Sequence, residues 1–256
     1  MGAPTRQRAI CNRSYSKSRR DGKADPDVDL PARLQTLIAQ LTKPLNGQYP
    51  RPWMTSSRTP WSAHVFTVGR NQRNGFGVEA VGSHEDYLDA LFNRNGSSCR
   101  GLYDRLTAKP SPTRLNTDRL VSKLDQVGIT EVLETNVICY STPMSSDLRS
   151  REHLGGKERG TELFRTLLEI IKPKVLIAHG AGTAKDLGRL LVASLPSVPS
   201  VPDKTARATV GDMAIWVIPS LAPPKWNSWM RWADEHLDLV CREVAEHLEL
   251  AGRNAG

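Results

Sequence analysis

Long apolar runs are missing from this chain of 256 residues. Its most apolar stretches, such as 174–180, are far shorter than the roughly 20 residues that a membrane-spanning helix needs. The start lacks the apolar segment of a secretory signal, and Arg6 occupies the position where a myristoylation signal has Ser or Thr. The sequence therefore predicts no membrane partner and a cytoplasmic or nucleoid-associated location. A transit peptide stays open as an alternative, because the first residues are rich in Arg and Ser.

Cysteine is scarce, and the sequence lacks metal-ligand motifs and phosphate-binding motifs. The four cysteines stand far apart without the CxxC or CxxxH spacing of zinc and iron–sulfur sites, so we expect reduced thiols and no metal. The sequence also has no Gly-x-Gly-x-x-Gly fingerprint and no P-loop, and Gly180-Ala-Gly182 is too short to replace them. No cofactor is predicted. The cysteines are Cys11, Cys99, Cys139 and Cys241.

Positive charge, in contrast, is plentiful. The formal net charge is +8, and a basic protein attracts polyanions and gains salt-sensitive affinity for nucleic acid. Residues 1–23 hold seven basic residues against Asp21 alone, which predicts a basic, flexible arm over 1–28. The remainder, 29–256, is long enough for one hydrophobic core and is predicted to form one domain.

Short apolar runs alternate with helical patterns along 29–256. Continuous apolar runs between helices are typical of a parallel sheet that is covered on both faces. We therefore predict an α/β fold, a three-layer α/β/α sandwich with a central, mostly parallel four-stranded sheet. The proline-rich segment 194–202 is expected to be an extended surface connection. The predicted strands are 64–69, 131–139, 174–180 and 213–219, and the predicted helices are 30–43, 84–94, 115–127, 158–172, 183–193 and 229–250.

Polar residues follow the predicted strands, where ligands bind in such sheets. The order of these segments along the chain resembles that of the uracil-DNA glycosylase superfamily, over roughly residues 62–245. Gly69-Arg-Asn-Gln72 is similar to its Gly-x-Asn-Pro loop, with Gln72 where the family has Pro; Thr135-Asn-Val-Ile138 is similar to its base-reading strand. Ile218-Pro-Ser220 is similar to its His-Pro-Ser loop, with Ile218 in place of His.

The resemblance implies a monofunctional hydrolase of base excision repair that acts without cofactors. Such an enzyme flips uracil out of single- or double-stranded DNA, hydrolyses the N-glycosidic bond and leaves an abasic site; we expect it to act as a monomer. By this match Asn71 positions the attacking water and Asn136 reads the uracil edge, since an amide offers a donor and an acceptor. Ile218 cannot polarise a leaving base, so backbone amides or His179 would have to do so, or activity would be weak.

Further residues are assigned to binding. A flipped base is expected to stack on an aromatic ring, and a side chain is expected to enter the gap in the DNA. Base binding is predicted for Gln72, Phe76, Phe92, Asn136 and Tyr140. DNA binding is predicted for Arg70, Arg73, Pro219, Ser220, Lys225 and Trp226, with Lys225 or Trp226 in the gap.

Simpler interpretations stand beside these. Asn71 is compatible with a turn before Asn74-Gly75, and Asn136 with an amide bonded to backbone inside a sheet. Trp229 and Trp232 have the spacing of core residues on a helix. Two other functions stay open: a catalytically weak or inactive protein of the same fold that binds DNA or modified bases, and an enzyme acting on free nucleosides or nucleotides.

Overall fold

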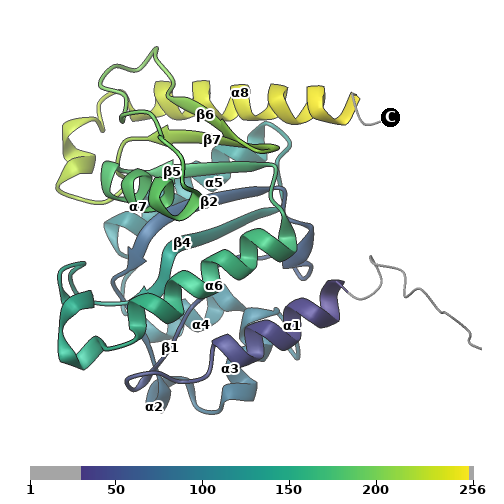
Figure 1. Cartoon of the computed structure of the whole chain (residues 1–256), viewed down its shortest axis with the longest axis vertical. Helices are drawn as coiled ribbons and strands as arrows, with labels where there is room; N and C mark the ends of the chain where they lie inside the picture. Colours follow the sequence, from purple (N-terminus) through teal and green to yellow (C-terminus); the bar gives the residue numbers. More distant parts are fainter. Residues whose placement is uncertain (1–29, 254–256) are drawn as a thin grey trace, which may run out of the picture.

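The computed structural model describes residues 30–253 and has the expected α/β architecture (Figure 1). The predicted arm 1–28 lies outside the described residues. The central sheet has the order β4-β2-β5-β7-β6, and its first four strands are parallel. Their bounds are β2 Val65–Gln72, β4 Val132–Ser141, β5 Val175–His179, β7 Met213–Ile218 and β6 Arg207–Val210.

The sheet has five strands, so the prediction of four was one short. β6 pairs antiparallel with β7 at the sheet edge and alternates between exposed and half-buried residues. A four-residue strand that buries no side chain fully has no apolar run to reveal it. The four predicted strands are the ones whose residues are mostly buried.

Helices cover both faces of this sheet, which makes the three layers (Figure 1). Alternate strand residues point to opposite faces, so Phe66 and Val68 join one apolar cluster and Val65 joins the other. α1 (Leu30–Leu41), α6 (Gly156–Ile171) and α7 (Ala181–Leu191) pack on the first face. The second face is covered by α5 (Pro112–Gln126) and α8 (Ala233–Arg253).

A smaller unit flanks β4. It contains α4, which was not predicted because its eight residues are fewer than the window over which helical periodicity is recognised. The segment 50–55 runs beside β4 and closes that edge with backbone hydrogen bonds to Glu134 and Cys139. The remaining elements are β1 Gln48–Tyr49, β3 Phe76–Gly77, α2 Val78–Val81, α3 His84–Leu91, α4 Cys99–Leu106 and the 3-10 turns Pro60–Ser62, Asp147–Arg149, Arg151–His153 and Lys225–Ser228.

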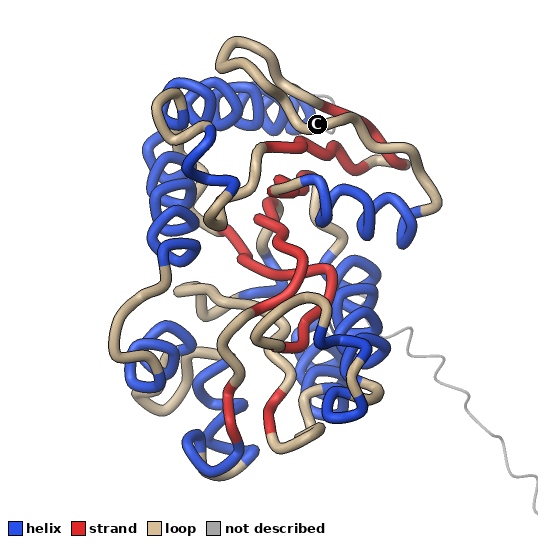
Figure 2. The backbone as a smooth tube through the Cα atoms, turned by 90° about the vertical axis from the view of Figure 1, so that its left-hand side faces the viewer, coloured by secondary structure: helices blue, strands red, loops and turns tan. Residues whose placement is uncertain are grey.

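The carboxyl ends of the parallel strands meet at one edge, which faces the viewer in Figure 2. The loops after β2, β4, β5 and β7 all emerge there, and the predicted site residues other than Phe92 lie on or near them. Among residues 30–253, no helix is long and apolar enough to cross a membrane. Cys99, Cys139 and Cys241 are buried free thiols.

Candidate functional site at the carboxyl edge of the sheet

Asn136 and His179 come together above Gly69, the residue between them in the sheet. Asn136 pairs with Gly69 in the β2–β4 register, and His179 ends β5 on the other side of β2. A Cβ atom on Gly69 would lie 2.9 Å from His179 Nε2 and still closer to Asn136 Oδ1. Because both polar atoms lie within 2.9 Å of the same point, the distance between them is less than twice 2.9 Å. A side chain on Gly69 would clash with both groups, which gives a physical reason for glycine at this position.

The side-chain amide of Asn136 is open to a ligand. It forms no hydrogen bond with any residue of 30–253, and its atoms are not among the fully buried polar atoms that lack a partner. The backbone carbonyl of Asn136 accepts from Cys139 Sγ at 3.1 Å. The structure thus does not show the alternative of a buried amide bonded to backbone. A polar side chain held on a rigid strand without a protein partner offers one donor and one acceptor to a ligand.

His179 is kept neutral by its surroundings. The residue is half-buried overall, but Nδ1 is fully buried and has no hydrogen-bond partner in 30–253. Desolvation lowers the pKa of His179 from 6.5 to about 4. Because an unpaired buried N–H costs more than an unpaired acceptor, we assign the proton to Nε2. The result is a neutral N–H donor beside the Asn136 amide.

This assignment predicts a pH dependence of stability. Between pH 6.5 and about 4 the unfolded chain protonates His179 and the folded protein does not, so stability falls as the pH is lowered through this range. Lowering the pH from 7 to 5 is expected to cost the wild type about 2 kcal/mol more than His179→Gln. Urea unfolding of both proteins at the two pH values measures this difference. An equal pH effect in both proteins would contradict the buried, neutral imidazole.

Asn71 lies on the same sheet face, two residues beyond Gly69. Its Nδ2 donates to Thr142 Oγ1 at 2.9 Å, and its Oδ1 accepts from Ser145 Oγ at 2.7 Å. Both ends of the amide therefore bind the turn after β4, and Oδ1 keeps one lone pair for a water. The water-positioning role stays a prediction, and Asn71 has a structural role as well.

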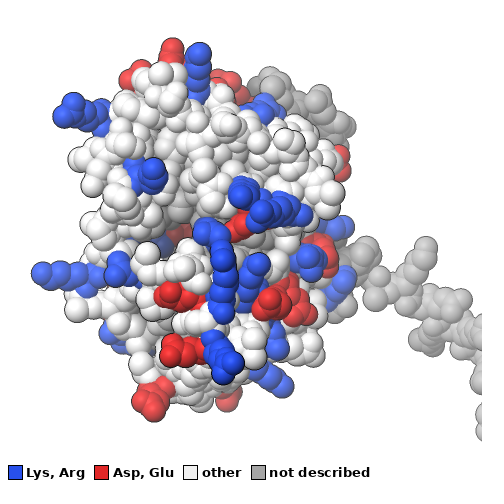
Figure 3. All heavy atoms as spheres, turned by 60° about the vertical axis from the view of Figure 1, so that its left-hand side comes forward, with Lys and Arg blue, Asp and Glu red and all other residues white. Residues whose placement is uncertain are grey.

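Lys and Arg side chains lie around and below a hollow in this face, with Asp and Glu side chains among those below it (Figure 3). Arg70 is held by Asp186 Oδ2 at 2.7 Å and keeps 42% of its side chain exposed. Residues 1–29 hold seven basic and four acidic residues, so residues 30–256 carry +5 of the net +8. The excess of positive charge is thus not confined to the arm. The loops 70–77 and 219–232 contain no acidic residue and four basic ones, Arg70, Arg73, Lys225 and Arg231.

The loop after β7 is fixed in place close to His179. Pro219 is buried, and Ser220 lies against Gly180, where an added Cβ would be 3.2 Å from Ser220 Cβ. Ser220 Oγ accepts from the amide of Ala222 at 3.2 Å, and the Ser220 carbonyl accepts from Trp229 Nε1 at 2.9 Å. Lys225 is exposed at the end of this loop.

The structure corrects both aromatic assignments. Phe76 is 1% exposed and packs edge-on against Tyr87 with the Arg51 guanidinium over its ring. Phe92 is 2% exposed and packs against Trp53 in the same cluster. Both rings lie in the core on the opposite face from Asn136, so neither can stack on a base at this site.

Three further residues that were predicted to bind the base or DNA are buried inside the protein. Gln72 is buried and its Nε2 donates to the Arg51 carbonyl at 2.8 Å, on the opposite side of β2 from Asn71. Tyr140 is fully buried beneath Gly156, with its hydroxyl bonded to Asn46 and His153. Trp226 is buried against Trp229, which leaves only Lys225 of the two predicted gap-filling residues.

Ile218 is fully buried beside His179 in the second cluster, so its alkyl chain has a core role. Trp229 is core as expected, although it precedes α8. The sequence reading missed Thr142, Ser145 and Asp186, which position Asn71 and Arg70. The first two follow β4 directly, so extending the strand-end rule two to five residues beyond Tyr140 would have found them.

Comparison with models of known protein families and with curated proteins finds no match for this chain. Within residues 30–253, no group of three or more His, Cys, Asp and Glu side chains is arranged to hold a metal ion. The chemistry of the edge is therefore that of amides, one imidazole, hydroxyls and cations.

Proposed function

We propose that the protein is a DNA N-glycosylase that excises uracil from DNA after flipping the base against Asn136 and His179 at the carboxyl edge of the sheet. The observation that carries this proposal is the pairing of an open amide with a neutral imidazole N–H less than twice 2.9 Å away. A uracil edge presents carbonyl oxygens and an N–H, which complement these groups. The cationic edge loops supply the phosphate contacts that hold a DNA strand.

In this mechanism the Asn136 amide donates to uracil O4 and accepts from N3–H. As the bond from C1′ to N1 breaks, its electron pair moves onto the uracil ring and negative charge builds on O2. His179 Nε2–H stabilises that charge by donation, and it stays neutral because protonation occurs only near pH 4. Water held by the free lone pair of Asn71 bonds to C1′ and releases its proton to solvent.

The proposal is tested with an oligonucleotide that contains one uracil, followed by alkaline cleavage of abasic sites. The wild-type protein should yield a cleaved strand from the uracil substrate and none from a thymine control of the same sequence. An absence of abasic product at protein concentrations that saturate DNA binding would contradict it.

Arg73→Ala and Lys225→Ala are expected to weaken DNA binding at all sequences alike. Each removes an exposed cation at the edge, so the plot of log binding constant against log salt should become shallower by about one unit. Binding titrations at several salt concentrations measure the slope. Lys174→Ala, which removes an exposed cation at the opposite end of β5, is the matched control. An equal loss of slope in this control would show that general charge, and not this edge, governs binding.

The second candidate is a base-binding protein of the same fold without efficient catalysis. The engagement of Asn71 with Thr142 and Ser145 favours it, because that amide is only partly free to hold a water. This candidate predicts salt-sensitive binding that depends on Asn136 with no abasic product. An enzyme for free nucleosides would instead act equally well on uracil nucleosides without DNA.

A further inference from the structure

A cavity lies at the opposite end of β2 from the candidate site. It has a volume of about 640 Å³, within the range of small-molecule sites, and is open to solvent. Trp61 precedes the first residue of β2, whereas Gly69 and Asn71 lie near its other end. Seven residues of strand at about 3.3 Å each separate the two places by roughly 20 Å. The cavity is therefore not part of the site above Gly69.

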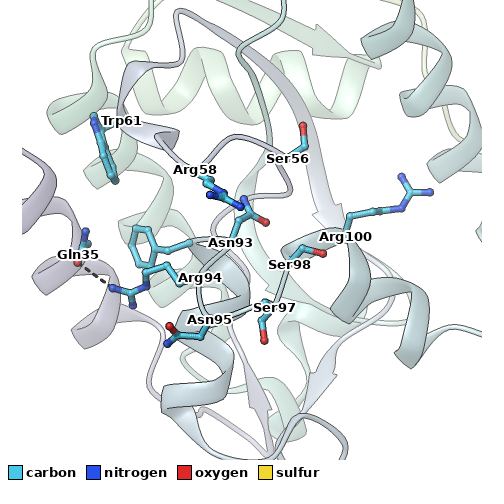
Figure 4. A pocket seen from close by; sticks show the side chains of 12 residues that line it. Gln35, Ser56, Arg58, Trp61, Asn93, Arg94, Asn95, Ser97, Ser98 and Arg100 are labelled. Atoms are coloured by element: carbon cyan, nitrogen blue, oxygen red, sulfur yellow. Dashed lines mark hydrogen bonds between the residues drawn. The ribbon is translucent and has the colours of Figure 1, made fainter.

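The walls of this cavity are cationic and rich in hydrogen-bond donors, and they contain no carboxylate. Figure 4 shows Arg58, Arg94 and Trp61 around the same space. The Arg100 side chain is directed away from it, and its guanidinium binds Asp104 and Asp118. The lining residues are Gln35, Ser56, Arg58, Trp61, Phe92, Asn93, Arg94, Asn95, Gly96, Ser97, Ser98 and Arg100.

The two arginines that face the cavity differ in how firmly they are held. Arg58 is exposed and has no hydrogen bond or ion pair with any residue of 30–253, so its guanidinium is available to an anion. Arg94 is held in place, and its Nε pairs with Asp89 Oδ1 at 3.5 Å. The Arg94 guanidinium lies 5.1 Å from the centre of the Phe92 ring, and its Nη1 donates to Gln35 Oε1 at 3.4 Å. Two Arg side chains beside a half-buried Trp ring match a phosphate and an aromatic base.

The loop 93–98 is fixed in advance of binding. Asn93 Nδ2 donates to the Ser57 carbonyl at 2.6 Å, and Asn93 Oδ1 accepts from the Cys99 amide at 3.0 Å. Asn93, Asn95 and Gly96 have left-handed φ values of 50°, 52° and 75°, which Asn and Gly tolerate. The loop thus ties the irregular segment that carries Arg58 to the start of α4, and a ligand need not order it.

The geometry points to a binding site for a nucleotide unit, with phosphate at Arg58 and Arg94 and the base against Trp61. The unit can come from a free mononucleotide or from a nucleic-acid strand. The site is independent of uracil excision, because none of its residues touches Asn136, His179 or Asn71.

The test uses the full chain, with calorimetric titration and the Trp61 indole N–H resonance as readouts. The probes are dAMP, inorganic phosphate and a ten-nucleotide oligo-dA. We expect dAMP to bind and to shift the Trp61 resonance, and Arg58→Ala to weaken binding about tenfold, the loss of one charge-assisted hydrogen bond. Arg105→Ala removes an exposed Arg on α4 outside the cavity and should leave binding unchanged.

The other probes and variants show whether the nucleotide comes from a strand or is free, and which results would overturn the proposal. Tighter Arg58-dependent binding of the oligonucleotide identifies a strand site, and equal affinity identifies a mononucleotide site; both support the proposal. Phosphate that binds as well as dAMP, an unmoved Trp61 resonance, or an equal effect of Arg105→Ala overturns it. Asn136→Ala should leave dAMP binding intact, so failure of the uracil proposal and failure of this one are separable.

Discussion

Asn136→Ala is expected to lower the rate of uracil excision at least about 100-fold while the protein stays folded. Removing the amide leaves the donors and acceptors of the buried base edge unpaired, and sites built to hydrogen-bond a substrate lose large factors when one partner is missing. The loss should appear in kcat/KM on the uracil oligonucleotide. Thermal unfolding should change little, because the Asn136 amide bonds to no described residue.

Two companion variants make this result specific. Asn136→Asp keeps the shape of the side chain but has no donor at neutral pH, so it should lose activity to a similar extent. Gln126→Ala removes an exposed amide at the end of α5 and should behave like the wild type. Full excision by both Asn136 variants would rule out a base-reading role.

His179→Ala is expected to lower excision by about 10² to 10³, which is the usual effect of deleting one donor to a developing anion. The imidazole acts through Nε2–H as a neutral donor, so the wild-type rate should show no His titration between pH 5.5 and 7.5, well above its pKa of about 4. Single-turnover cleavage across this pH range measures both effects.

His179→Gln separates donation from packing, because a glutamine amide retains an N–H donor. It should recover part of the activity that His179→Ala loses, whereas His179→Leu, which fills similar space without a donor, should not. Equal recovery by the two variants would mean that the imidazole serves only to fill space. A rate that falls steeply below pH 7 in the wild type would instead mean that His179 ionises in the normal range and acts by another route.

Much of the fold follows from the sequence for a physical reason. β2, β4, β5 and β7 are covered on both faces, so their residues form unbroken apolar runs that stand out between helices. β6 and α4 were not predicted, because an edge strand that buries no side chain fully has no apolar run and an eight-residue helix is shorter than the window over which helical periodicity is recognised. The positions of the strand ends were therefore predictable, and so was the edge where Asn136, His179 and Asn71 meet.

The orientation of individual side chains could be predicted less well from the sequence. Phe76 lies just beyond the segment 69–72, but closeness in the sequence does not decide which face of a sheet a side chain takes. Gln72 illustrates this, since it lies next to Asn71 and points to the opposite side. Phe92 caps the C-terminal end of α3, where core packing fixes its ring. The shared space above Gly69 depends on the register of three strands, which no local sequence pattern records.

The pairing of Asn136 and His179 on one base is tested most directly by nitrogen-15 NMR of their side chains. The protein would be titrated with free uracil and, in parallel, with thymidine monophosphate as a larger pyrimidine. The account predicts that uracil shifts the Asn136 amide and the His179 Nε2 resonances together, with one shared dissociation constant. Uracil that saturates the protein while both resonances stay in place, or that moves only one of them, would contradict it.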